Sequence, residues 1–329
     1  MKILQADCEH IARGYGYEDT LKHIERCGRV CYKSEDKITQ GSAEKFVKSV
    51  IKRGHEAVLE HASFIVDVSH PVYRDLRERI EMLEDSIGFQ SFLRFSADWK
   101  IDRFIVSGNV RAWRDFLRAH GRMTPKWSLP NFMEDFLKSQ GILFEDILEE
   151  VAVSQYRWVD SRFNLITPAE LVTDREKLIH WEETYLFTCD RGVSHEIVRH
   201  RPAGYCQEST RYCNYGLNGE VAVIKPSFLE EDTPAYHHWE NACKVAEHDY
   251  CNMLINGCTP QEARAVLPNS LKTEVVMSTY MMEWRHFLEL RCAKAAHPQM
   301  REVTQIRLYL AWLEAPELFE ELWKNTEIG

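Results

Sequence analysis

The chain has 329 residues, of which 44% are hydrophobic and 28% charged, a composition typical of a folded globular protein. Its net charge of −10 disfavours general binding to nucleic acid, although a small anion can bind where cations cluster. The N-terminus has no apolar run of signal-peptide length and no membrane-spanning stretch follows, so we expect a cytoplasmic protein without membrane or nucleic-acid partners. The ten cysteines are expected to be reduced, because a core of this size needs no disulfides.

The first part of the chain predicts a helix followed by a strand. Ser42 is expected as the N-cap and Gly54 as the end of the helix. Between them, apolar residues recur at helical spacing, at Phe46, Val47, Val50 and Ile51. The stretch "GHEAVLEH" comes next, and "ASFIVDV" then predicts a strand.

The middle of the chain mixes helical and extended patterns. "RFIVSGNVRAW" predicts a strand that runs into a turn, and helical segments are expected at residues 111–118 and 135–155. "ETYLFTCDRG" predicts another strand and turn. "VSHEIVRHR" predicts a short helix that ends before Pro202, because the residue before a proline disfavours helical angles.

The last part of the chain is expected to be mostly helical. Thr259 and Glu262 form a capping box around Pro260, which predicts a helix that carries Arg264 and stops near Pro268. "TEVVMSTYMMEWRHFLELR" predicts one long helix, with Val275, Tyr280, Phe287 and Leu290 on its apolar stripe. A final helical region spans about 300–324, interrupted near Pro316. Helices with a few interspersed strands indicate an α+β or α/β class.

Several familiar ligand motifs fail on this sequence. In "HEAVLEH" the second histidine, His61, comes six residues after His55, and six residues rotate a helix by about 240°, so the rings point apart. There is no Cys-x-x-Cys pair, and we expect no metal site. Neither a Walker A loop nor a dinucleotide fingerprint is present. A nucleotide cofactor would therefore be bound without those folds.

One short segment concentrates positive charge in this acidic chain. It reads "RHRPAGYCQESTRY" and runs from Arg199 to Tyr212. Arg199-His200-Arg201, then seven residues, then Ser209 resembles the signature of the flavin-dependent thymidylate synthases. "GHEAVLEHASF", "EARAVLP", "EWRHFLELR" and "HPQMREV" resemble other parts of that family, in the family's order.

The resemblance covers roughly the first 65 residues and then residues 183 to about 315. It implies a single domain over residues 1–329, with an insertion at about 68–183. It also implies an α+β, helix-rich fold with a central mixed or antiparallel sheet. The family is typically a homotetramer with active sites at subunit interfaces. The implied reaction makes dTMP from dUMP, with methylenetetrahydrofolate as carbon donor and FAD reduced by NADPH.

A phosphate-bearing substrate suits the arginines of the signature. Guanidinium forks match phosphate oxygens, which makes Arg199, Arg211 and Arg264 candidates, and Ser209 and the backbone N–H groups of residues 208–211 can add donors. By resemblance, Gln207 lies between the nucleotide and the flavin. The implied substrate-binding residues are Glu196, Arg199, Gln207, Glu208, Ser209, Thr210, Arg211, Arg264 and Arg291.

The resemblance also implies a set of flavin-binding residues: His55, Ala57, Glu60, Arg199, His200, Arg201, Gln207, Tyr280, Met282 and His286. This sequence departs from the family at Tyr280 and Met282, where an asparagine and an arginine are usual, and Met282 offers no charge to a flavin. Cys206 lies among the signature arginines, whose positive field should lower the pKa of its thiol. We nevertheless expect Cys206 to fill space beside the nucleotide, without acting as a nucleophile.

Arg291 is the expected catalytic residue. In the family, the matching arginine faces the uracil ring. A fixed cation there favours an enolate-like form of the ring, which makes C5 a better nucleophile. Three alternatives stay open: C5-methylation of another pyrimidine nucleotide, a catalytically silent nucleotide-binding relative, and a ligand-free structural protein.

Overall fold

The computed structural model describes residues 1–123, 131–148, 162–216 and 221–326. A first four-stranded antiparallel sheet has the order β2-β7-β10-β8 and a second has the order β4-β5-β3-β6. The strands of the first are β2 (Asp7–His10), β7 (Glu182–Asp190), β10 (Lys272–Tyr280) and β8 (Gly204–Gln207). The strands of the second are β4 (Arg94–Asp98), β5 (Arg103–Asn109), β3 (Ser63–Val68) and β6 (Phe163–Ile166). A parallel pair joins β1 (Lys2–Leu4) to β9 (Ala222–Ile224).

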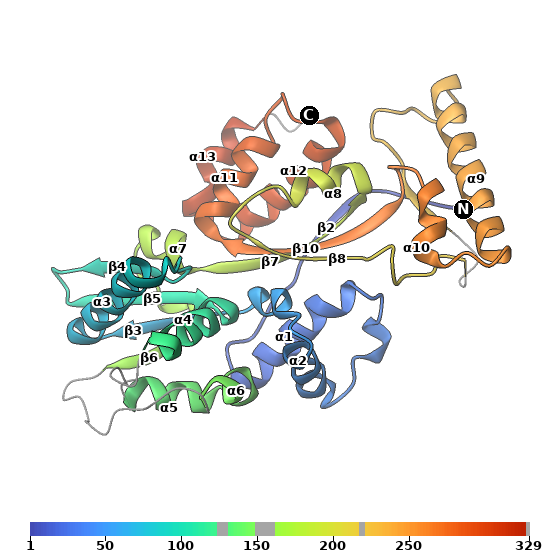
Figure 1. Cartoon of the computed structure of the whole chain (residues 1–329). Coiled ribbons are helices and arrows are strands. Elements are labelled where there is room, and N and C mark those ends of the chain that lie inside the picture. Colours follow the sequence, from blue (N-terminus) through green and yellow to red (C-terminus); the bar gives the residue numbers. More distant parts are fainter. Residues whose placement is uncertain (124–130, 149–161, 217–220, 327–329) are drawn as a thin grey trace.

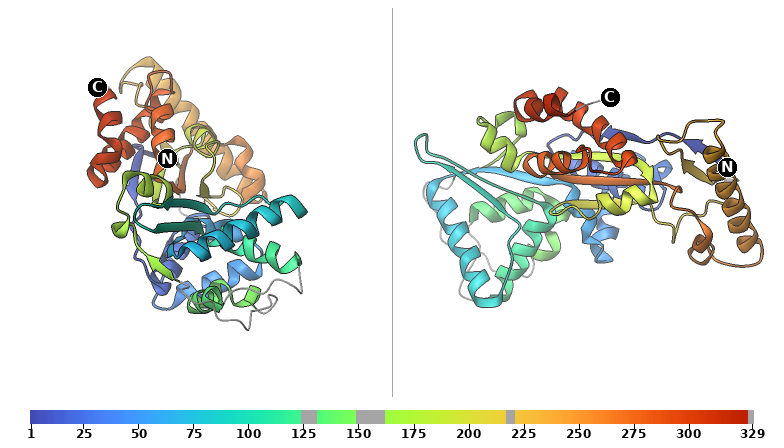
Figure 2. Two further views of the ribbon diagram at one scale, coloured as in Figure 1. Left: turned by 90° about the vertical axis from the view of Figure 1, so that its left-hand side faces the viewer. Right: turned by 90° about the horizontal axis from the view of Figure 1, so that it is seen from above.

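Helices cover both faces of the first sheet (Figure 1). One face carries α11 (Met281–Arg291), α12 (Pro298–Glu314) and α13 (Pro316–Asn325), and their apolar side chains share a core with β7 and β10. α1 (Tyr17–Val30) contacts β8 and β10 from the other side. The second sheet and its helices lie at one end of the molecule and α9 (Pro234–Ile255) at the other (Figures 1 and 2).

The second sheet shares its core with the N-terminal helices. Leu21 and Ile24 of α1 and Val47 of α2 are buried in one cluster with Val106 of β5 and Phe116 of α4. The described helices and strands between Val68 and Ile147 thus contribute side chains to the same core as the first 65 residues. The expectation of one domain with an insertion stays a prediction. The helices around this core are α2 (Ser42–Lys52), α3 (His70–Ile87), α4 (Val110–Met123), α5 (Asn131–Ser139), α6 (Glu145–Leu148) and α7 (Asp174–His180).

The long helix expected over "TEVVMSTYMMEWRHFLELR" is wrong in its first half. Residues 272–280 form β10, which pairs with β7 on one side and β8 on the other, and the helix begins only at Met281. A strand buried on both faces shows a continuous apolar run, which imitates one stripe of a helix. Threonine and valine at 273, 275, 276 and 279 favour the extended form.

Several predicted boundaries move by a few residues. α2 starts at Ser42 with Gly41 as its N-cap, and Gly54 with φ +70° follows its end as predicted. β5 runs directly into α4 where a turn was expected, because the Asn109 side chain accepts the N–H of Ala112. The predicted turn after β7 is the start of α8 (Arg191–Ile197), since Asp190 accepts the N–H of Val193.

Three further expectations concern the remaining helices. The helix expected at residues 135–155 is broken after Ser139, and residues 149–155 lie outside the described part. The capping box of Thr259 and Glu262 is confirmed, although α10 (Pro260–Ala263) ends before Arg264, which begins a 3-10 turn. The break at Pro316 is confirmed between α12 and α13.

All ten cysteines are unpaired, as expected, and no described helix combines the length and apolarity needed to cross a membrane.

Candidate functional site

A cavity of about 410 Å³ lies where the first sheet meets β4 and α4. Three predicted flavin-binding residues line it: Glu60 from the 3-10 helix η2 (Glu56–His61), Arg201 after α8, and Tyr280 at the end of β10. Gly204 lets β8 approach η2, because a Cβ at this position would lie 2.8 Å from the Cβ of Glu60. The fold therefore joins residues that are up to 220 positions apart in sequence, from Glu60 to Tyr280.

Two buried polar groups in the cavity wall lack well-placed protein partners. The Tyr280 hydroxyl has no hydrogen bond of good geometry within the described residues, and Oε2 of Glu182 has only an ion-pair contact, 3.7 Å from Nη1 of Arg13, although the two residues are only 6% and 7% exposed. Burial raises the pKa of Glu182 to about 7. Buried groups of this kind normally find a partner in a ligand, in water or in protein. These residues fit a bound group that offers hydrogen bonds, as a flavin does.

Other predicted flavin residues lie outside the cavity. His55 and Ala57 are exposed on η2 and its cap, and Met282 and His286 are exposed on α11. His200 is buried with its ring 5.6 Å from the ring of His286. Burial, followed by the charge of His286, lowers the pKa of His200 to about 4, so its imidazole is neutral at neutral pH. The predicted flavin set is thus divided between the cavity and the outer surface.

The fold brings Arg264 to the signature turn. Its Nη1 donates to Oγ1 of Thr210 at 3.1 Å, across 54 residues of sequence. Arg211 lies in this turn and is exposed, and Arg199 is exposed just after α8. The three arginines expected at a phosphate therefore have exposed side chains, and Ser209 is half-buried in the turn.

The expected backbone donors of the turn need correction. The N–H of Glu208 donates to the Glu274 carbonyl at 2.9 Å, and the N–H of Ser209 donates to the Cys31 carbonyl at 3.0 Å. The N–H of Arg211 points to Oγ of Ser209 at 3.3 Å. These groups are already used inside the chain, so side chains are left as the main donors to a phosphate.

The buried side chain of Glu208 holds the signature turn in place. Its fully buried carboxylate accepts from Lys272 at 3.1 Å and from the Tyr215 hydroxyl at 2.8 Å, and Lys33 stands 3.2 Å away. Arg191 donates to the Glu208 carbonyl at 3.2 Å. The sequence analysis missed Lys272 and Arg191. A lysine inside a run of β-branched residues is the signal, since a charge on a central strand needs a buried partner.

Arg291 is held by the segment that precedes the signature. Its Nη1 lies 3.2 Å from Oε2 of Glu196, and its Nη2 donates to the Glu196 carbonyl at 3.2 Å. Nearby, the amide of Gln207 donates to Oγ of Ser194 at 2.8 Å. The two contacts fix the predicted site residues Arg291 and Gln207 against α8, at positions about 200° apart around the helix.

Cys206 points into the core. It is 2% exposed and packs with Cys27, Val30 and Val276. A hydrogen bond with Cys31, together with burial, raises the pKa of its thiol. The expected lowering of this pKa by the arginines is therefore wrong, because the side chain is directed away from them.

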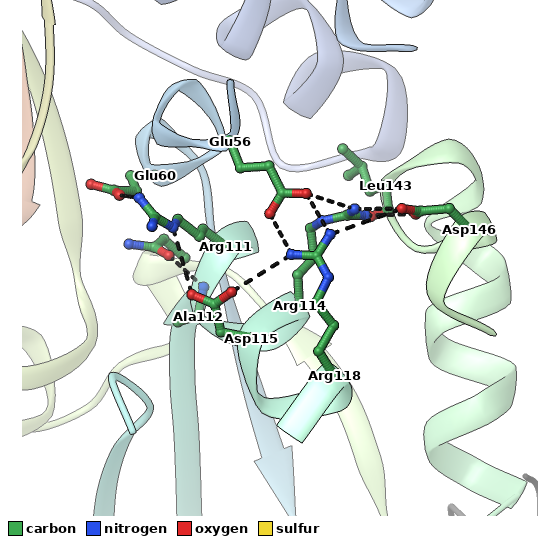
Figure 3. A network of polar contacts seen from close by, with 10 residues as sticks. Glu56, Glu60, Arg111, Ala112, Arg114, Asp115, Arg118, Leu143 and Asp146 are labelled. Carbon is green, nitrogen blue, oxygen red and sulfur yellow. Dashed lines mark hydrogen bonds and ion pairs between the residues drawn. The ribbon is translucent and has the colours of Figure 1, made fainter. Parts of the chain in front are cut away.

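η2 is tied to α4 by a cluster of ion pairs (Figure 3). Arg114 and Arg118 both donate to Glu56, and Arg111 donates to Glu60. Burial alone would raise the pKa of Glu56, but the hydrogen bonds from Arg118 and Arg114 outweigh it and lower that pKa to about 2. The segment expected to contact the flavin is therefore positioned by a helix from the middle of the chain.

One group of side chains in the described part of the chain has the spacing of metal ligands. His10 lies between two carboxylates, 2.5 Å from Glu183 and 2.9 Å from Glu314. Burial lowers the pKa of His10, but the hydrogen bonds to both carboxylates outweigh it and raise the pKa to about 9. A protonated imidazole cannot ligate a metal, so at neutral pH this group is an ion triad.

His10 should make stability depend on pH. A pKa raised from 6.5 to about 9 contributes stability that is complete below pH 6.5 and disappears as the pH rises through 9. Allowing for partial exposure, we expect the free energy of unfolding to fall by about 1–2 kcal/mol across this range. His10→Gln should flatten this part of the profile in urea titrations. His238→Gln, at an exposed position on α9, should not; an unchanged slope in His10→Gln would contradict the assignment.

The fold and the site define an α+β protein with a cavity lined by three arginines and a signature turn that Arg264 contacts. A family model described as thymidylate synthase complementing protein matches residues 16–80 and 177–317. The chain belongs to this family. The residues between the two matched stretches, 81–176, are called the unmatched segment below.

Individual relatives carry a more specific name. A flavin-dependent thymidylate synthase from Thermococcus kodakarensis is 33% identical over 141 residues, which are 43% of this chain and 53% of the relative. One from Geobacter sulfurreducens is 30% identical over 131 residues, 40% of this chain and 56% of the relative. One from Pyrococcus horikoshii is 27% identical over 182 residues, 52% of this chain and 70% of the relative. The chain spans about half the length of the first of these relatives.

Proposed function

We propose that this protein is a flavin-dependent thymidylate synthase, which converts dUMP to dTMP with methylenetetrahydrofolate as carbon donor. The observation that carries the proposal is the contact of Arg264 with Thr210, which joins two segments of the predicted phosphate site, in a chain whose cavity is lined by the predicted flavin residues Glu60, Arg201 and Tyr280. Family membership supports it independently.

Different residues bind the two ligands, dUMP and FAD. Arg199, Arg211 and Arg264 bind the phosphate of dUMP through charge-assisted hydrogen bonds, and Ser209 adds a hydroxyl. Arg291, fixed by Glu196, places its charge at the pyrimidine and stabilises the negative charge that develops on the ring. Gln207, fixed by Ser194, lies between the two ligands.

FAD, when bound, supplies the redox chemistry, with NADPH as the source of electrons. The chain's own contribution is a cavity lined by Glu182, Arg201 and Tyr280, whose side chains carry groups able to hydrogen-bond. His55, Ala57, Met282 and His286 lie on the outer surface, which favours a site completed by another subunit of a homotetramer. A cytoplasmic location suits these substrates.

A direct test combines flavin uptake with an assay of three substrates. The purified protein should bind FAD at micromolar concentration, with absorbance near 450 nm, and form dTMP from dUMP in the presence of NADPH and methylenetetrahydrofolate. UMP and dCMP serve as competing substrates. A protein that takes up no flavin, or that prefers UMP or dCMP, would refute the proposal in this form.

Cys206→Ser should retain most of the activity. The thiol is buried in an apolar cluster and its pKa is raised, so it is unsuited to attack the pyrimidine. Mass spectrometry after incubation with 5-fluoro-dUMP should show no nucleotide attached to this residue. A covalent adduct on Cys206, together with an inactive Cys206→Ser variant, would overturn the mechanism and leave the substrate unchanged.

A further inference from the structure

The cavity beside β10 has two walls of different origin. Glu182, Arg201 and Tyr280 belong to the stretches that the family model matches. Other lining residues come from the unmatched segment and include Arg94 at the start of β4 and Arg111 at the start of α4. Half of the cavity is therefore built by residues outside the family match.

The arginines that line the cavity differ in how fully carboxylates neutralise their charge. Arg111 is paired with Glu60 and lies 3.5 Å from Asp115. Arg94 stands 3.8 Å from Glu283, beyond hydrogen-bond distance, and its guanidinium lies 4.0 Å from the centre of the Tyr280 ring. Stacking on an aromatic face leaves the N–H edges of a guanidinium free to bind a ligand.

Arg201, from the part of the lining that the family model matches, supplies a second cation. Its side chain donates to the backbone carbonyls of Val198 and His200, and no carboxylate pairs with it in the described part of the chain. Neither Arg94 nor Arg201 hydrogen-bonds to a carboxylate in the described part of the chain, whereas Arg111 is paired with Glu60, so Arg94 and Arg201 are the cations that the cavity offers to an anionic ligand.

The rest of the cavity suits the flat part of a nucleotide. Phe92 lines it and is 60% exposed, so its ring is available for stacking. A volume of about 410 Å³ lies within the range of about 300–1,000 Å³ that is usual for small-molecule sites. An aromatic surface beside two arginines matches a ligand that joins a ring to phosphates.

We propose that Arg94, together with Arg201, binds the diphosphate of the dinucleotide cofactor, so that the unmatched segment completes the cofactor site. This rests on the proposed function, since it assumes that the cofactor is FAD. It assigns to the unmatched segment a role in binding, in addition to its structural contact with η2.

The test measures the affinity of FAD and of ADP, which shares the phosphates and lacks the flavin ring, by isothermal titration calorimetry. Loss of a charge-assisted contact to phosphate should weaken both ligands about ten- to a hundred-fold in Arg94→Leu. Arg94→Lys keeps the charge without the planar fork and should show an intermediate loss. Arg77→Leu is the matched control, because Arg77 is exposed on α3 and pairs with Glu81.

Each outcome decides one point. Unchanged FAD affinity in a folded Arg94→Leu protein overturns the proposal, and Arg94→Lys provides the same reading if the leucine variant does not fold. A loss for FAD without a loss for ADP moves Arg94 from the phosphates to the flavin ring and refutes the assignment. If the wild-type protein binds no FAD, the proposed function fails, and the ADP titrations alone decide whether Arg94 binds phosphate.

Discussion

Arg114→Leu is expected to lower the free energy of unfolding by about 3–5 kcal/mol, because it removes one partner from a buried ion-pair cluster. Arg114 is fully buried in α4 and donates to Glu56 at 3.0 Å, to Asp146 at 2.7 and 2.9 Å, and to the Leu143 carbonyl. Its loss leaves the Leu143 carbonyl without this donor and Glu56 with two of its three hydrogen bonds from arginine (Figure 3). Urea unfolding at pH 7 measures the effect.

Arg118→Leu is the matched control for this prediction. Arg118 contacts the same carboxylate from the same helix, but its side chain is 32% exposed, so water can replace part of the contact. We expect a loss of about 1 kcal/mol, the upper end of the range for exposed pairs. Equal losses in the two variants would show that burial does not decide the energetics of this cluster.

The position of Glu56 explains why variants that destabilise the ion-pair cluster should also bind FAD more weakly. Glu56 begins η2, and Glu60 at its other end lines the cavity. α4 holds both carboxylates, Glu56 through Arg114 and Arg118 and Glu60 through Arg111. A variant that loosens this cluster should therefore bind FAD more weakly even at temperatures where it is folded.

Local patterns in the sequence predicted the local structure best. The strand over "ASFIVDV", the capping box of Thr259 and the break at Pro316 depend on neighbours in the chain, and all three are confirmed. β10 was predicted as helix because helices bury both of its faces, α11 on one side and α1 on the other, and its partner strands β7 and β8 come from distant parts of the sequence. Periodicity alone cannot distinguish such a strand from a buried helix.

The site shows the same division. The signature made Arg199 and Arg211 candidates, and the order of motifs made Arg264 and Arg291 candidates, and these roles stay predictions. Glu182, Arg94 and Lys272 were missed, because their importance comes from long-range packing: Glu182 and Arg94 line the cavity, and Lys272 pairs with buried Glu208. Cys206 shows the opposite error, since sequence proximity to arginines says nothing about the side of the strand to which a thiol points.

Arg291→Lys is expected to lower kcat about a hundred-fold or more while changing the KM for dUMP only slightly. Lysine keeps the charge but cannot contact both Oε2 and the carbonyl of Glu196, so the cation is no longer held in one place. Removing one fixed donor from a site of developing negative charge typically costs about 10²–10³ in turnover. A loss in kcat alone marks an interaction made in the transition state.

Two further variants make this result specific to Arg291. Arg285→Lys lies on the same helix, where Arg285 makes only partly exposed contacts with Glu289 and Glu321, and its turnover should match that of the wild type. Glu196→Gln keeps an acceptor for Arg291 and removes its negative charge, so it should reduce kcat by less than Arg291→Lys does. A wild-type kcat in Arg291→Lys would remove the residue from catalysis. A raised KM with unchanged kcat would instead make Arg291 a substrate-binding residue, because uniform binding of ground state and transition state changes only KM.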